Sequence, residues 1–503
     1  MNAATYHKLT SYHRKNMSPH NLDWGHMPRL YKSYPPLFST ALQPAGELPD
    51  VSLMKAFGEK WADRASPAVL NFEGLSTILT LANGFTAKRS YGTQTHFYRS
   101  APSAGALCPN EICVATGPVD GLAPGIYNYQ VKSVALVRLR KGWHLRQITE
   151  TLTDGPERTP AVSLLISGIF FRSAWKYGQR AYRYVLLNAG HLIENLVLAL
   201  NAYGYSYSVH YDFDDESMGG LLGIDEQREV CLACLNIFDD RASEPRQSVK
   251  PPVELAGLER GVIEASRISA AEVSYSAITQ AYTAGKTVRN DTAESADPYP
   301  VVDNMPQNWF PVRKTAEPIV SLGYVKSVLK RRSRRNFLQY PLKAANTMRL
   351  LEMLCMASDR CVDEGQTYAG CMVPGFMAVN VEGFDSGFYL LVTKKKAYGL
   401  VSGGSLGQKT AHVCLDQQWL KNGAVHFLFM ANLAEVDLHQ GPRGYRYAML
   451  NAGRAGQRVY LAATALGYGA CGIGALYDDE ASKMLSLNDQ SALLYLVAVG
   501  STK

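Results

Sequence analysis

The chain repeats a thirteen-residue motif once, 263 positions further on. Residues 178–190 read GQRAYRYVLLNAG and residues 441–453 read GPRGYRYAMLNAG, with nine identities. The same offset pairs Asp215 with Asp478 and Gln227 with Gln490, so the register extends beyond the motif without a gap. Stacked repeats have periods of roughly 20–50 residues, and a much longer period indicates a duplicated domain. The surroundings of each copy therefore decide whether both copies keep the same role.

The composition agrees with two globular domains. The 503 residues are 47% hydrophobic and 19% charged, which suffices for two cores at about 150 residues per domain. The net charge of +7 is small, and basic residues cluster only at 330–335 and 394–396, so we expect no nucleic-acid partner. The N-terminus lacks a secretory core, and no run approaches roughly 18 consecutive apolar residues. We expect a soluble, cytoplasmic protein without a membrane partner.

The nine cysteines are scattered mostly through apolar runs, which is typical of reduced, buried thiols. Cys231 and Cys234 have the spacing of a redox or half-zinc motif. They lie in the strand-like VCLACLNIF, however, and no second CxxC or nearby His pair accompanies them. We interpret both as core residues and expect no metal site.

Composition and pattern divide the chain into four segments. Residues 1–50, rich in Tyr, Pro and His, are typical of an arm that wraps a domain. Residues 51–245 and 319–503 form two units, each with helical and strand-like patterns, which predicts an α/β (α+β) class. Residues 246–318 form a connector, with a helical pattern around 254–284 and then a polar run. The strand order cannot be read from the sequence.

The first candidate site is the basic segment KRRSRRNF, residues 330–337, expected to continue a helix. Several arginines and a serine hydroxyl on one helical turn can hold a phosphate through charge-assisted bonds. The alternative is a solvated basic helix face or a nucleic-acid patch. The nearest counterpart in the first unit, residues 62–72, offers only Arg64 and Ser66.

The second candidate is the glycine-rich GYGACGIG at 467–474. Glycines allow backbone N–H groups to approach a flat or anionic ligand, although a plain turn would look the same. Its counterpart in the first unit, GYSYSVHY, keeps only the first glycine.

The third candidate is the turn RSAPSAGALCP at 99–109, which exposes backbone groups and the Ser103 hydroxyl and leaves room for a large ring. The second unit has GQTYAGCMVPG at this place and lacks the Pro-Ser-Ala-Gly run. This motif is therefore present only in the first unit, whereas the first two candidates are present only in the second.

The fourth candidate is the pair Lys176-Tyr177. A lysine beside a tyrosine can form a base in two ways: the ammonium stabilises a phenolate, or a desolvated neutral lysine accepts the proton while the phenol donates a hydrogen bond. The alternative is a surface lysine next to a packed tyrosine. The second unit has His439 and Gln440 at these positions, so a catalytic pair could come only from the first unit.

The repeated motif itself favours a structural role, with salt bridges and packing where two long helices meet. Asn188, His191 and Glu194 follow at helical steps. They can face a ligand or be satisfied polar groups at an interface.

Together these motifs resemble the flavin-dependent nitroreductase superfamily, and within it the SagB-type (SagB/ThcOx) peptide dehydrogenases. The resemblance rests on APSAGAL followed by Pro109 and Glu111, on GIYNY, on WKYGQRAYRY with LLNAGH, on RRSRRNF and on LGYGACGIG. The N-terminal LDW, Pro28 and YKSYPP are similar to the opening of two-domain members. The resemblance covers most of the chain except the connector, and implies two tandem nitroreductase-like domains that form an intramolecular pseudo-dimer.

Nitroreductases are typically dimers with FMN at the subunit interface, which implies one composite FMN site in this chain. The symmetry-related pocket would have neither a phosphate clamp nor a Pro-Ser turn. The resemblance implies that the phosphate and ribityl chain are bound by Arg331, Arg332, Ser333 and Arg335. It implies that the ring lies beside the Pro-Ser turn, with Pro102, Ser103, Ala104 and Gly105, and beside the glycine-rich segment, with Gly472, Ile473 and Gly474.

In the SagB-type family the Lys-Tyr pair is associated with oxidation of thiazolines or oxazolines in a peptide. By that analogy Lys176 and Tyr177 remove a ring proton while hydride passes to the flavin, which oxygen reoxidises. The implied substrate is a peptide or a carrier-bound heterocycle. A cyclodehydratase partner and a homodimer of pseudo-dimers stay open. Glu194 stands where the family usually has Gln, and TYAGCMVPG is divergent, so substrate and reaction direction can differ.

Two other functions stay open. An NAD(P)H-dependent reductase of nitro compounds or quinones would use the same FMN. The Lys-Tyr pair and the lack of GxGxxG oppose it, although nitroreductases bind nicotinamide without that fingerprint. The alternative of another class is a flavin-free scaffold that holds a peptide for a partner enzyme.

Overall fold

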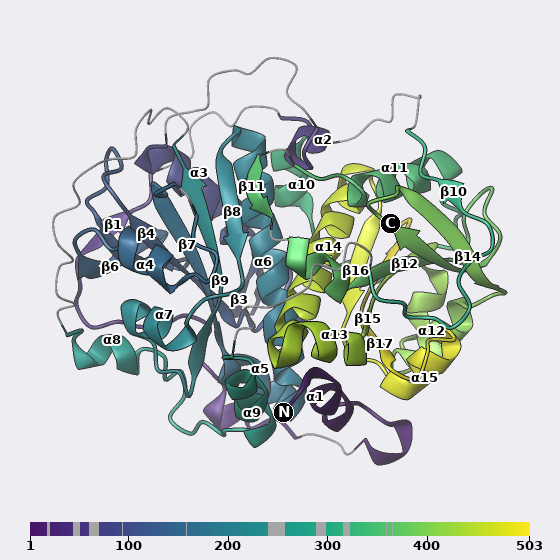
Figure 1. The fold of residues 1–503 in the computed structure, drawn as a ribbon, viewed down its shortest axis with the longest axis horizontal. Helices are drawn as coiled ribbons and strands as arrows, with labels where there is room; N and C mark the ends of the chain where they lie inside the picture. Colours follow the sequence, from purple (N-terminus) through teal and green to yellow (C-terminus); the bar gives the residue numbers. More distant parts are fainter. Residues whose placement is uncertain are drawn as a thin grey trace.

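Two mixed α/β domains lie side by side in the computed structural model of this chain (Figure 1). Each domain is built around one largely antiparallel sheet, and a long helix from each lies at the boundary between them. This confirms the tandem arrangement that the repeat predicts. The structure describes residues 1–17, 21–43, 51–59, 70–92, 94–156, 158–239, 257–287, 298–314, 322–358, 360–364 and 366–503.

The two sheets have the same strand order at their centres. In the first sheet the order is β1-β6-β5-β4-β7-β9-β8-β11, and in the second it is β10-β14-β13-β12-β15-β17-β16. The shared core of six strands is what a duplicated domain requires. The first sheet contains β1 Ser39–Ala41, β4 Asn110–Thr116, β5 Gly125–Gln130, β6 Ala135–Lys141, β7 Val162–Ile169, β8 Ser206–His210, β9 Glu229–Phe238 and β11 Cys361–Glu364. The second contains β10 Phe310–Pro311, β12 Val373–Ala378, β13 Gly387–Val392, β14 Ala397–Gly403, β15 Val425–Asn432, β16 Gly469–Ile473 and β17 Ser491–Gly500.

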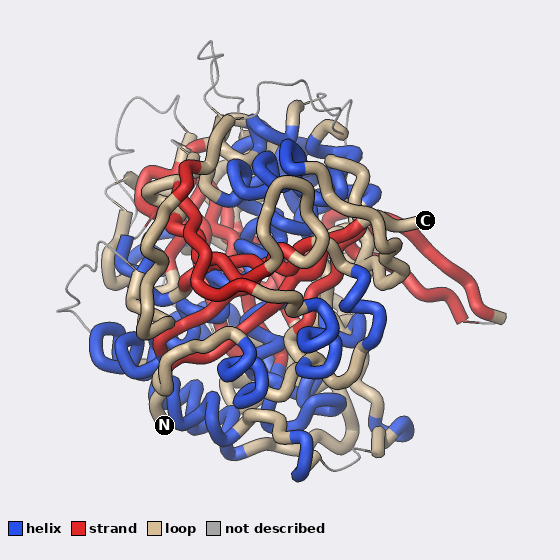
Figure 2. The backbone as a smooth tube through the Cα atoms, turned by 90° about the vertical axis from the view of Figure 1, so that its right-hand side faces the viewer, coloured by secondary structure: helices blue, strands red, loops and turns tan. Residues whose placement is uncertain are grey.

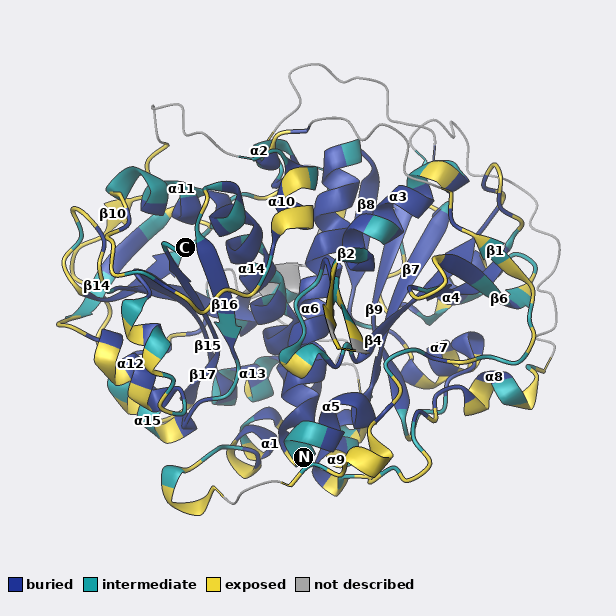
Figure 3. Ribbon diagram, turned by 180° about the vertical axis from the view of Figure 1, so that it is seen from behind, coloured by how far each residue is buried: buried dark blue, intermediate teal, exposed yellow. Residues whose placement is uncertain are grey.

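A separate hairpin of β2 (Phe85–Tyr91) and β3 (Gln94–Arg99) projects from the body in Figure 2. The outer helices show exposed faces in Figure 3, whereas the two central ones, α6 and α14, are almost wholly buried. The helices are α1 Ala3–Leu9, α2 Leu53–Ala56, α3 Phe72–Asn83, α4 Leu145–Thr151, α5 Phe170–Tyr177, α6 Ala181–Tyr203, α7 Asp215–Leu222, α8 Arg260–Glu264, α9 Ser276–Ala284, α10 Tyr324–Lys330, α11 Ala344–Leu354, α12 Gly407–Val413, α13 Leu433–Gln440, α14 Gly444–Ala465 and α15 Asp478–Met484.

The repeated motif forms the crossing of α6 and α14. A Cβ on Gly190 would lie 2.2 Å from the Leu450 carbonyl oxygen, and a Cβ on Gly453 would lie 2.3 Å from that of Leu187. Only glycine allows backbones to approach this closely. The final glycine of each motif is thus fixed by the partner helix, as the structural interpretation of the repeat expects.

The motif arginines exchange salt bridges between the domains. Arg180 and Arg183 bind Asp478 at 2.7 and 2.6 Å. Their counterparts Arg443 and Arg446 bind Asp215, and all of these side chains are buried. Each acidic partner begins a short helix of the opposite domain. A two-fold dimer has such self-complementary contacts, and here one chain retains both halves.

Two segments tie the domains together further. Strand β11, from the second unit, pairs in parallel with β8 at the edge of the first sheet. The N-terminal arm contacts both domains: Asp437 accepts hydrogen bonds from the first turn of α1, and β1 pairs with β6. The arm also places Lys32 in a buried ion pair with Glu229 at 2.7 Å. Helices α8 and α9 lie in the connector.

The helical stretch Phe170–Tyr203, which comprises α5 and α6, is long and apolar enough to cross a membrane by length and composition alone. The sequence did not indicate this, because the prediction considered only unbroken apolar runs. The most apolar window of this stretch is completely buried inside the protein. A core helix between two domains has the same composition. Cys231 and Cys234 are free and buried in β9, as expected, and burial raises the pKa of both thiols.

One local prediction is wrong. Helix α10 ends at Lys330, and the following segment is extended, with Ser333 bridged in parallel to Ala470 of β16. The basic residues therefore do not share a helical turn. The alternative of a plain turn for the glycine-rich segment does not hold, because Gly469–Ile473 form strand β16. Both segments are extended because they pair at the edge of the sheet, and such long-range pairing cannot be read from helical periodicity.

Candidate functional site

The Pro-Ser turn is held in a specific backbone shape by α6. Asn188 donates to the Ser103 hydroxyl at 3.2 Å and accepts from the Ala104 N–H at 3.3 Å. The Ser103 hydroxyl accepts in turn from the Cys108 N–H at 2.8 Å. Gly105, Ala106 and Cys108 have positive φ. Such conformations cost energy for residues other than glycine, and they cluster at functional sites.

A buried arginine supports the same turn from behind. Arg172 of α5 pairs with Glu111 at 2.6 Å and donates to the carbonyls of Cys108 and Arg29. Glu111, one of the residues that carry the resemblance, therefore acts through Arg172. The turn, α5 and the N-terminal arm form one rigid support.

Lys176 and Tyr177 lie against this turn. A Cβ on Gly105 would be 2.9 Å from the Tyr177 hydroxyl and 3.3 Å from Lys176 Cδ. Burial, followed by the neighbouring Tyr184, raises the pKa of Tyr177 above its usual value, and Arg335 opposes the rise. Tyr177 is therefore a neutral phenol near pH 7 and can donate a hydrogen bond. Among the described residues no ion pair or hydrogen bond engages the Lys176 ammonium, which lies 5.7 Å from the Tyr177 ring centroid.

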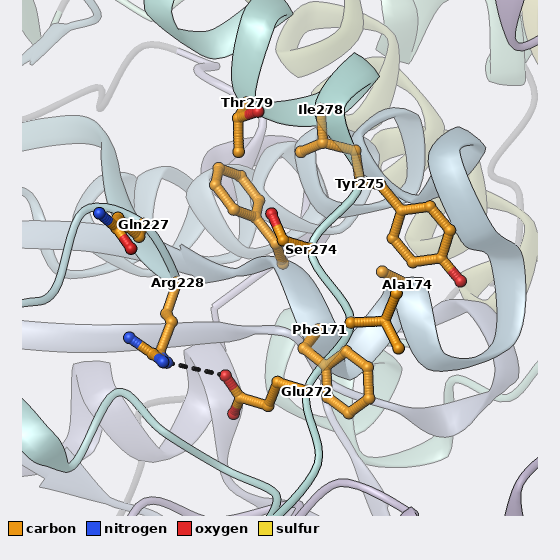
Figure 4. A pocket seen from close by; sticks show the side chains of 11 residues that line it. Phe171, Ala174, Gln227, Arg228, Glu272, Ser274, Tyr275, Ile278 and Thr279 are labelled. Carbon is orange, nitrogen blue, oxygen red and sulfur yellow. Dashed lines mark hydrogen bonds and ion pairs between the residues drawn. The ribbon is translucent and has the colours of Figure 1, made fainter.

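The connector covers another face of α5. Tyr275 and Ile278 from the connector face Phe171 and Ala174 of α5 in Figure 4, and Arg228 and Glu272 are ion-paired beside them. The gap between these elements is about 90 Å³, far below the roughly 300–1,000 Å³ of ligand pockets. We interpret it as a small gap in the packing of the connector against α5, and we infer that this packing holds α5 in place.

The second domain supplies the opposite wall. The Ser333 and Tyr460 hydroxyls are 3.0 Å apart, and the Gly472 N–H donates to Tyr460 at 2.6 Å. The Tyr184 hydroxyl, from the first domain, donates to the Gly474 carbonyl at 3.3 Å. Tyr184 also packs on Tyr177 with ring centroids 4.3 Å apart. A continuous line of contacts therefore links the Lys-Tyr pair to β16 and Ser333.

Arg331 crosses from the second domain to the first. Its side chain donates to the carbonyls of Ser100 and Arg99 at 2.6 and 3.0 Å, just before the Pro-Ser turn. Burial lowers the pKa of Arg331 to about 10, so the guanidinium stays charged near pH 7. Its Nη1 is buried without a hydrogen-bond partner in the described part of the chain. An unsatisfied charged donor of this kind favours an anionic ligand.

Side chains alternate in direction along an extended segment, and Arg332 points away from Arg331 and Ser333. It donates to the carbonyls of Thr86 in β2 and Leu329. With Lys330 and Arg334 it lines a separate groove of about 480 Å³ beside Gly467 and Gly469. Arg335 is exposed, and its charge acts on Tyr177 and Cys471.

The structure thus brings most of the predicted residues to one inter-domain site and separates Arg332 from them. Sequence reasoning did not single out Tyr460, which joins Ser333 to Gly472. One signal was available in the sequence. The residue 263 positions before Tyr460 is Val197, which lacks a hydroxyl, so only the second copy has this group. The counterpart segment with Arg64 and Ser66 lies outside the described residues.

The three polar residues of α6 face different ways. Asn188 holds the Pro-Ser turn, as described above. His191 lies between Gln457 and Tyr495 at 3.0 and 2.9 Å, and burial lowers its pKa to about 3. Glu194 pairs with Arg454 and Arg458 of α14. His191 and Glu194 are thus satisfied polar groups at the domain interface.

The donor set fits a flavin mononucleotide on two structural observations. Arg331 offers a buried N–H, unpaired among the described residues, for a phosphate or ribityl oxygen. The Pro-Ser turn follows Ser100, whose carbonyl accepts from Arg331, and its small residues leave room for a ring. Gly472 is required by protein packing, because the Tyr495 hydroxyl fills the space of its missing side chain. No cluster of possible metal ligands occurs among the described residues.

Comparisons with known proteins agree with this arrangement. The sequence model of the nitroreductase family matches residues 66–236 and 389–501, together more than half of the chain. A protein of Methanocaldococcus jannaschii named as a nitroreductase is 29% identical over 174 residues, which are 33% of this chain and 86% of that protein. The trifolitoxin-processing protein TfxB of Rhizobium leguminosarum bv. trifolii is 25% identical over 170 residues, 31% of this chain and 45% of TfxB.

A crystal structure from Anabaena variabilis, of a protein also named as a nitroreductase, has the same fold over both complete chains, with a TM-score of 0.79 at 22% identity. The duplicated fold, the shared strand order and the family match over both units lead to one conclusion. This chain belongs to the nitroreductase family, whose members are oxidoreductases.

Proposed function

We propose that this oxidoreductase is an FMN-dependent dehydrogenase of the SagB type. It oxidises thiazoline or oxazoline rings of a peptide or carrier-bound substrate to azoles. The observation that carries the proposal is the contact of Lys176 and Tyr177 with Gly105 of the Pro-Ser turn. The Lys176 amine, which no carboxylate contacts among the described residues, and the Tyr177 phenol would thus lie beside a substrate bound on the flavin ring.

The residues supply proton transfer and orientation. Converting an azoline to an azole removes one proton and one hydride, and the ring becomes aromatic. The Lys176 side chain would accept the proton, and the Tyr177 phenol would donate a hydrogen bond that holds the substrate ring in place. When bound, FMN supplies the hydride acceptor, and oxygen regenerates its oxidised form. Tyr184, packed on Tyr177, keeps the phenol in position.

The cofactor would lie across the domain boundary. Arg331, Ser333 and Arg335 would hold its phosphate and ribityl chain, with Gly472, Ile473 and Gly474 beside the ring. Pro102, Ser103, Ala104 and Gly105 would cover the ring from the first domain. Arg332 would act on the phosphate only from the groove that it shares with Lys330 and Arg334. The basic segment lies outside the two segments that match the family.

The name of TfxB supports a role in natural-product processing, because it describes that relative as a trifolitoxin-processing protein. An enzyme that forms azolines, a cyclodehydratase, would then be the partner that supplies the substrate. The chemistry requires this order, since a ring must exist before it can be aromatised.

Stopped-flow absorbance separates this proposal from reduction by NAD(P)H. The flavin-loaded protein is mixed anaerobically with either NADPH or a short peptide that contains one thiazoline. We expect the peptide to bleach the flavin bands and NADPH to leave them unchanged over the same time. Rapid bleaching by NADPH alone would instead establish a nitro or quinone reductase. A protein that takes up no flavin would support the scaffold alternative.

Replacing Lys176 by Met tests its role in proton transfer. We expect flavin absorbance to persist and turnover of the thiazoline peptide to fall by about 10²–10⁴-fold, the usual contribution of a positioned acid or base. Lys395→Met, on an exposed turn of the second domain, is the matched control and should turn over normally. A Lys176→Met enzyme with normal turnover would remove this residue from the mechanism.

A further inference from the structure

Tyr460 of α14 joins the groups of the second domain that the proposed function assigns to the cofactor. Its side chain is almost wholly buried, and its ring centroid lies 5.5 Å from the guanidinium carbon of Arg331. Its hydroxyl oxygen accepts from the Gly472 N–H at 2.6 Å and lies 3.0 Å from the Ser333 hydroxyl. One phenol therefore contacts residues proposed for the phosphate side and a residue proposed for the ring side of the flavin site.

The contact with Gly472 continues the outer edge of β16. Along this edge Ser333 is bridged to Ala470, and the Arg334 N–H donates to the Ala470 carbonyl at 2.8 Å. Two residues further along, the Gly472 N–H has the Tyr460 hydroxyl as its partner instead of a backbone carbonyl. A backbone N–H can only donate, so the Tyr460 oxygen accepts this hydrogen bond and its own proton points elsewhere.

The direction of the hydrogen bond between Tyr460 and Ser333 follows from this. Burial raises the pKa of Tyr460 above its usual value, so the phenol keeps its proton at neutral pH. A buried hydroxyl needs an acceptor, and the Ser333 oxygen is within hydrogen-bond distance. The Cys471 thiol also interacts with the phenol, but its sulfur is a weak acceptor. Ser333 therefore accepts from Tyr460 and keeps its own proton to donate.

We propose that Tyr460 is a positioning residue that makes the exposed Ser333 hydroxyl a donor toward the phosphate of FMN. This role rests on the proposed function, because it requires FMN at the composite site. A hydroxyl that donates to an anion forms a charge-assisted hydrogen bond, which riboflavin, without a phosphate, cannot accept. Tyr460 would thus favour FMN over riboflavin. The first copy has Val197 at the corresponding position, so only one copy carries this hydroxyl.

Fluorescence titration of the full-length protein with FMN and with riboflavin, after removal of bound flavin, tests the proposal. The quantity measured is the ratio of the Kd for riboflavin to the Kd for FMN. Tyr460→Phe keeps the ring beside Arg331 and removes only the hydroxyl. We expect it to lower this ratio by roughly tenfold or more, the usual effect of one hydrogen bond to a charged group. Ser333→Ala should lower the ratio similarly, and the double variant should lower it no further.

Tyr445→Phe is the matched control. It removes another buried hydroxyl of α14, which lies 3.1 Å from His7 Nδ1 in the N-terminal arm, and it should keep the wild-type ratio. Equal weakening of FMN and riboflavin by Tyr460→Phe would show a merely structural role and overturn the proposal. An unchanged ratio, or additive losses in the double variant, would overturn it too. A wild-type protein that bound neither flavin would instead refute the proposed function, and this role with it.

Discussion

At the scale of single residues, His7 links the N-terminal arm to the interface salt bridges. Its Nε2 lies 3.2 Å from both Arg183 and Asp478, and its Nδ1 lies 3.1 Å from the Tyr445 hydroxyl. Burial, and then the Arg183 charge, lowers the pKa of His7 to about 4. Burial would raise the pKa of Asp478, but Arg183, Arg180 and His7 hold it well below its usual value.

These shifts predict the pH dependence of stability. The unfolded chain protonates His7 near pH 6.5, whereas the folded chain does so near pH 4. The free energy of unfolding should therefore be highest above pH 6.5 and fall as the pH drops toward 4, by about 3 kcal/mol at most from this residue. Chemical denaturation across this range should show a shallower pH dependence for His7→Gln than for the wild-type protein. Identical slopes for His7→Gln and wild type would contradict the assignment.

At the scale of elements, α6 and α14 depend on two glycines for their close crossing. In an exposed helix, replacing glycine by alanine stabilises by roughly 1 kcal/mol. At Gly190 or Gly453 the new methyl group would meet a carbonyl oxygen of the partner helix within about 2.3 Å. The tight packing therefore reverses the usual sign.

We expect Gly190→Ala and Gly453→Ala each to reduce the free energy of unfolding by about 1–3 kcal/mol, the range for overpacking in a core. Gly220→Ala in α7 is the matched control, because nothing lies within 4 Å of the added carbon. Its Tm should stay the same or rise in a thermal melt. A Gly190→Ala protein as stable as wild type would show that the helices are not in contact at this point.

At the scale of the whole molecule, the proposed function divides the work of one site between the duplicated halves. The first domain carries the Lys-Tyr pair and the Pro-Ser turn, and the second carries Arg331, Ser333 and β16. Strand β11 and the exchanged arginine–aspartate clusters hold the halves in register. In a fused chain each half can change separately, so one of the two sites can be lost while the other keeps the function. In a homodimer encoded by one gene, every substitution changes both sites at once.

This division predicts one flavin per chain. Absorbance of the purified, FMN-saturated protein should give a flavin-to-chain ratio near one, and Arg331→Met should lower it. Arg334→Met is the control: it changes the neighbouring groove, so an equal loss there would show that the phosphate lies on the groove side. A ratio near two would contradict the asymmetry of the two sites.

Three features could be predicted from the sequence alone: the repeat, the uneven distribution of the candidate motifs, and the mixture of helix and strand patterns. They rest on local identity and periodicity, which survive in a linear sequence. The prediction that the basic residues form a phosphate clamp on one helical turn was wrong. The segment after Lys330 is extended because Ser333 pairs with β16, and Arg332 therefore points away from Ser333. Tyr460 was missed because no motif surrounds it.

By itself, then, the sequence determined that one domain had been doubled and that the copies had diverged in opposite ways. Only the tertiary structure decided which residues meet. Contacts between positions hundreds of residues apart depend on how α6 and α14 cross and on which edge each strand joins. Those contacts pair Glu194 with Arg454 and Arg458 at the domain interface, and they leave Lys176 without an ionic partner among the described residues beside the turn.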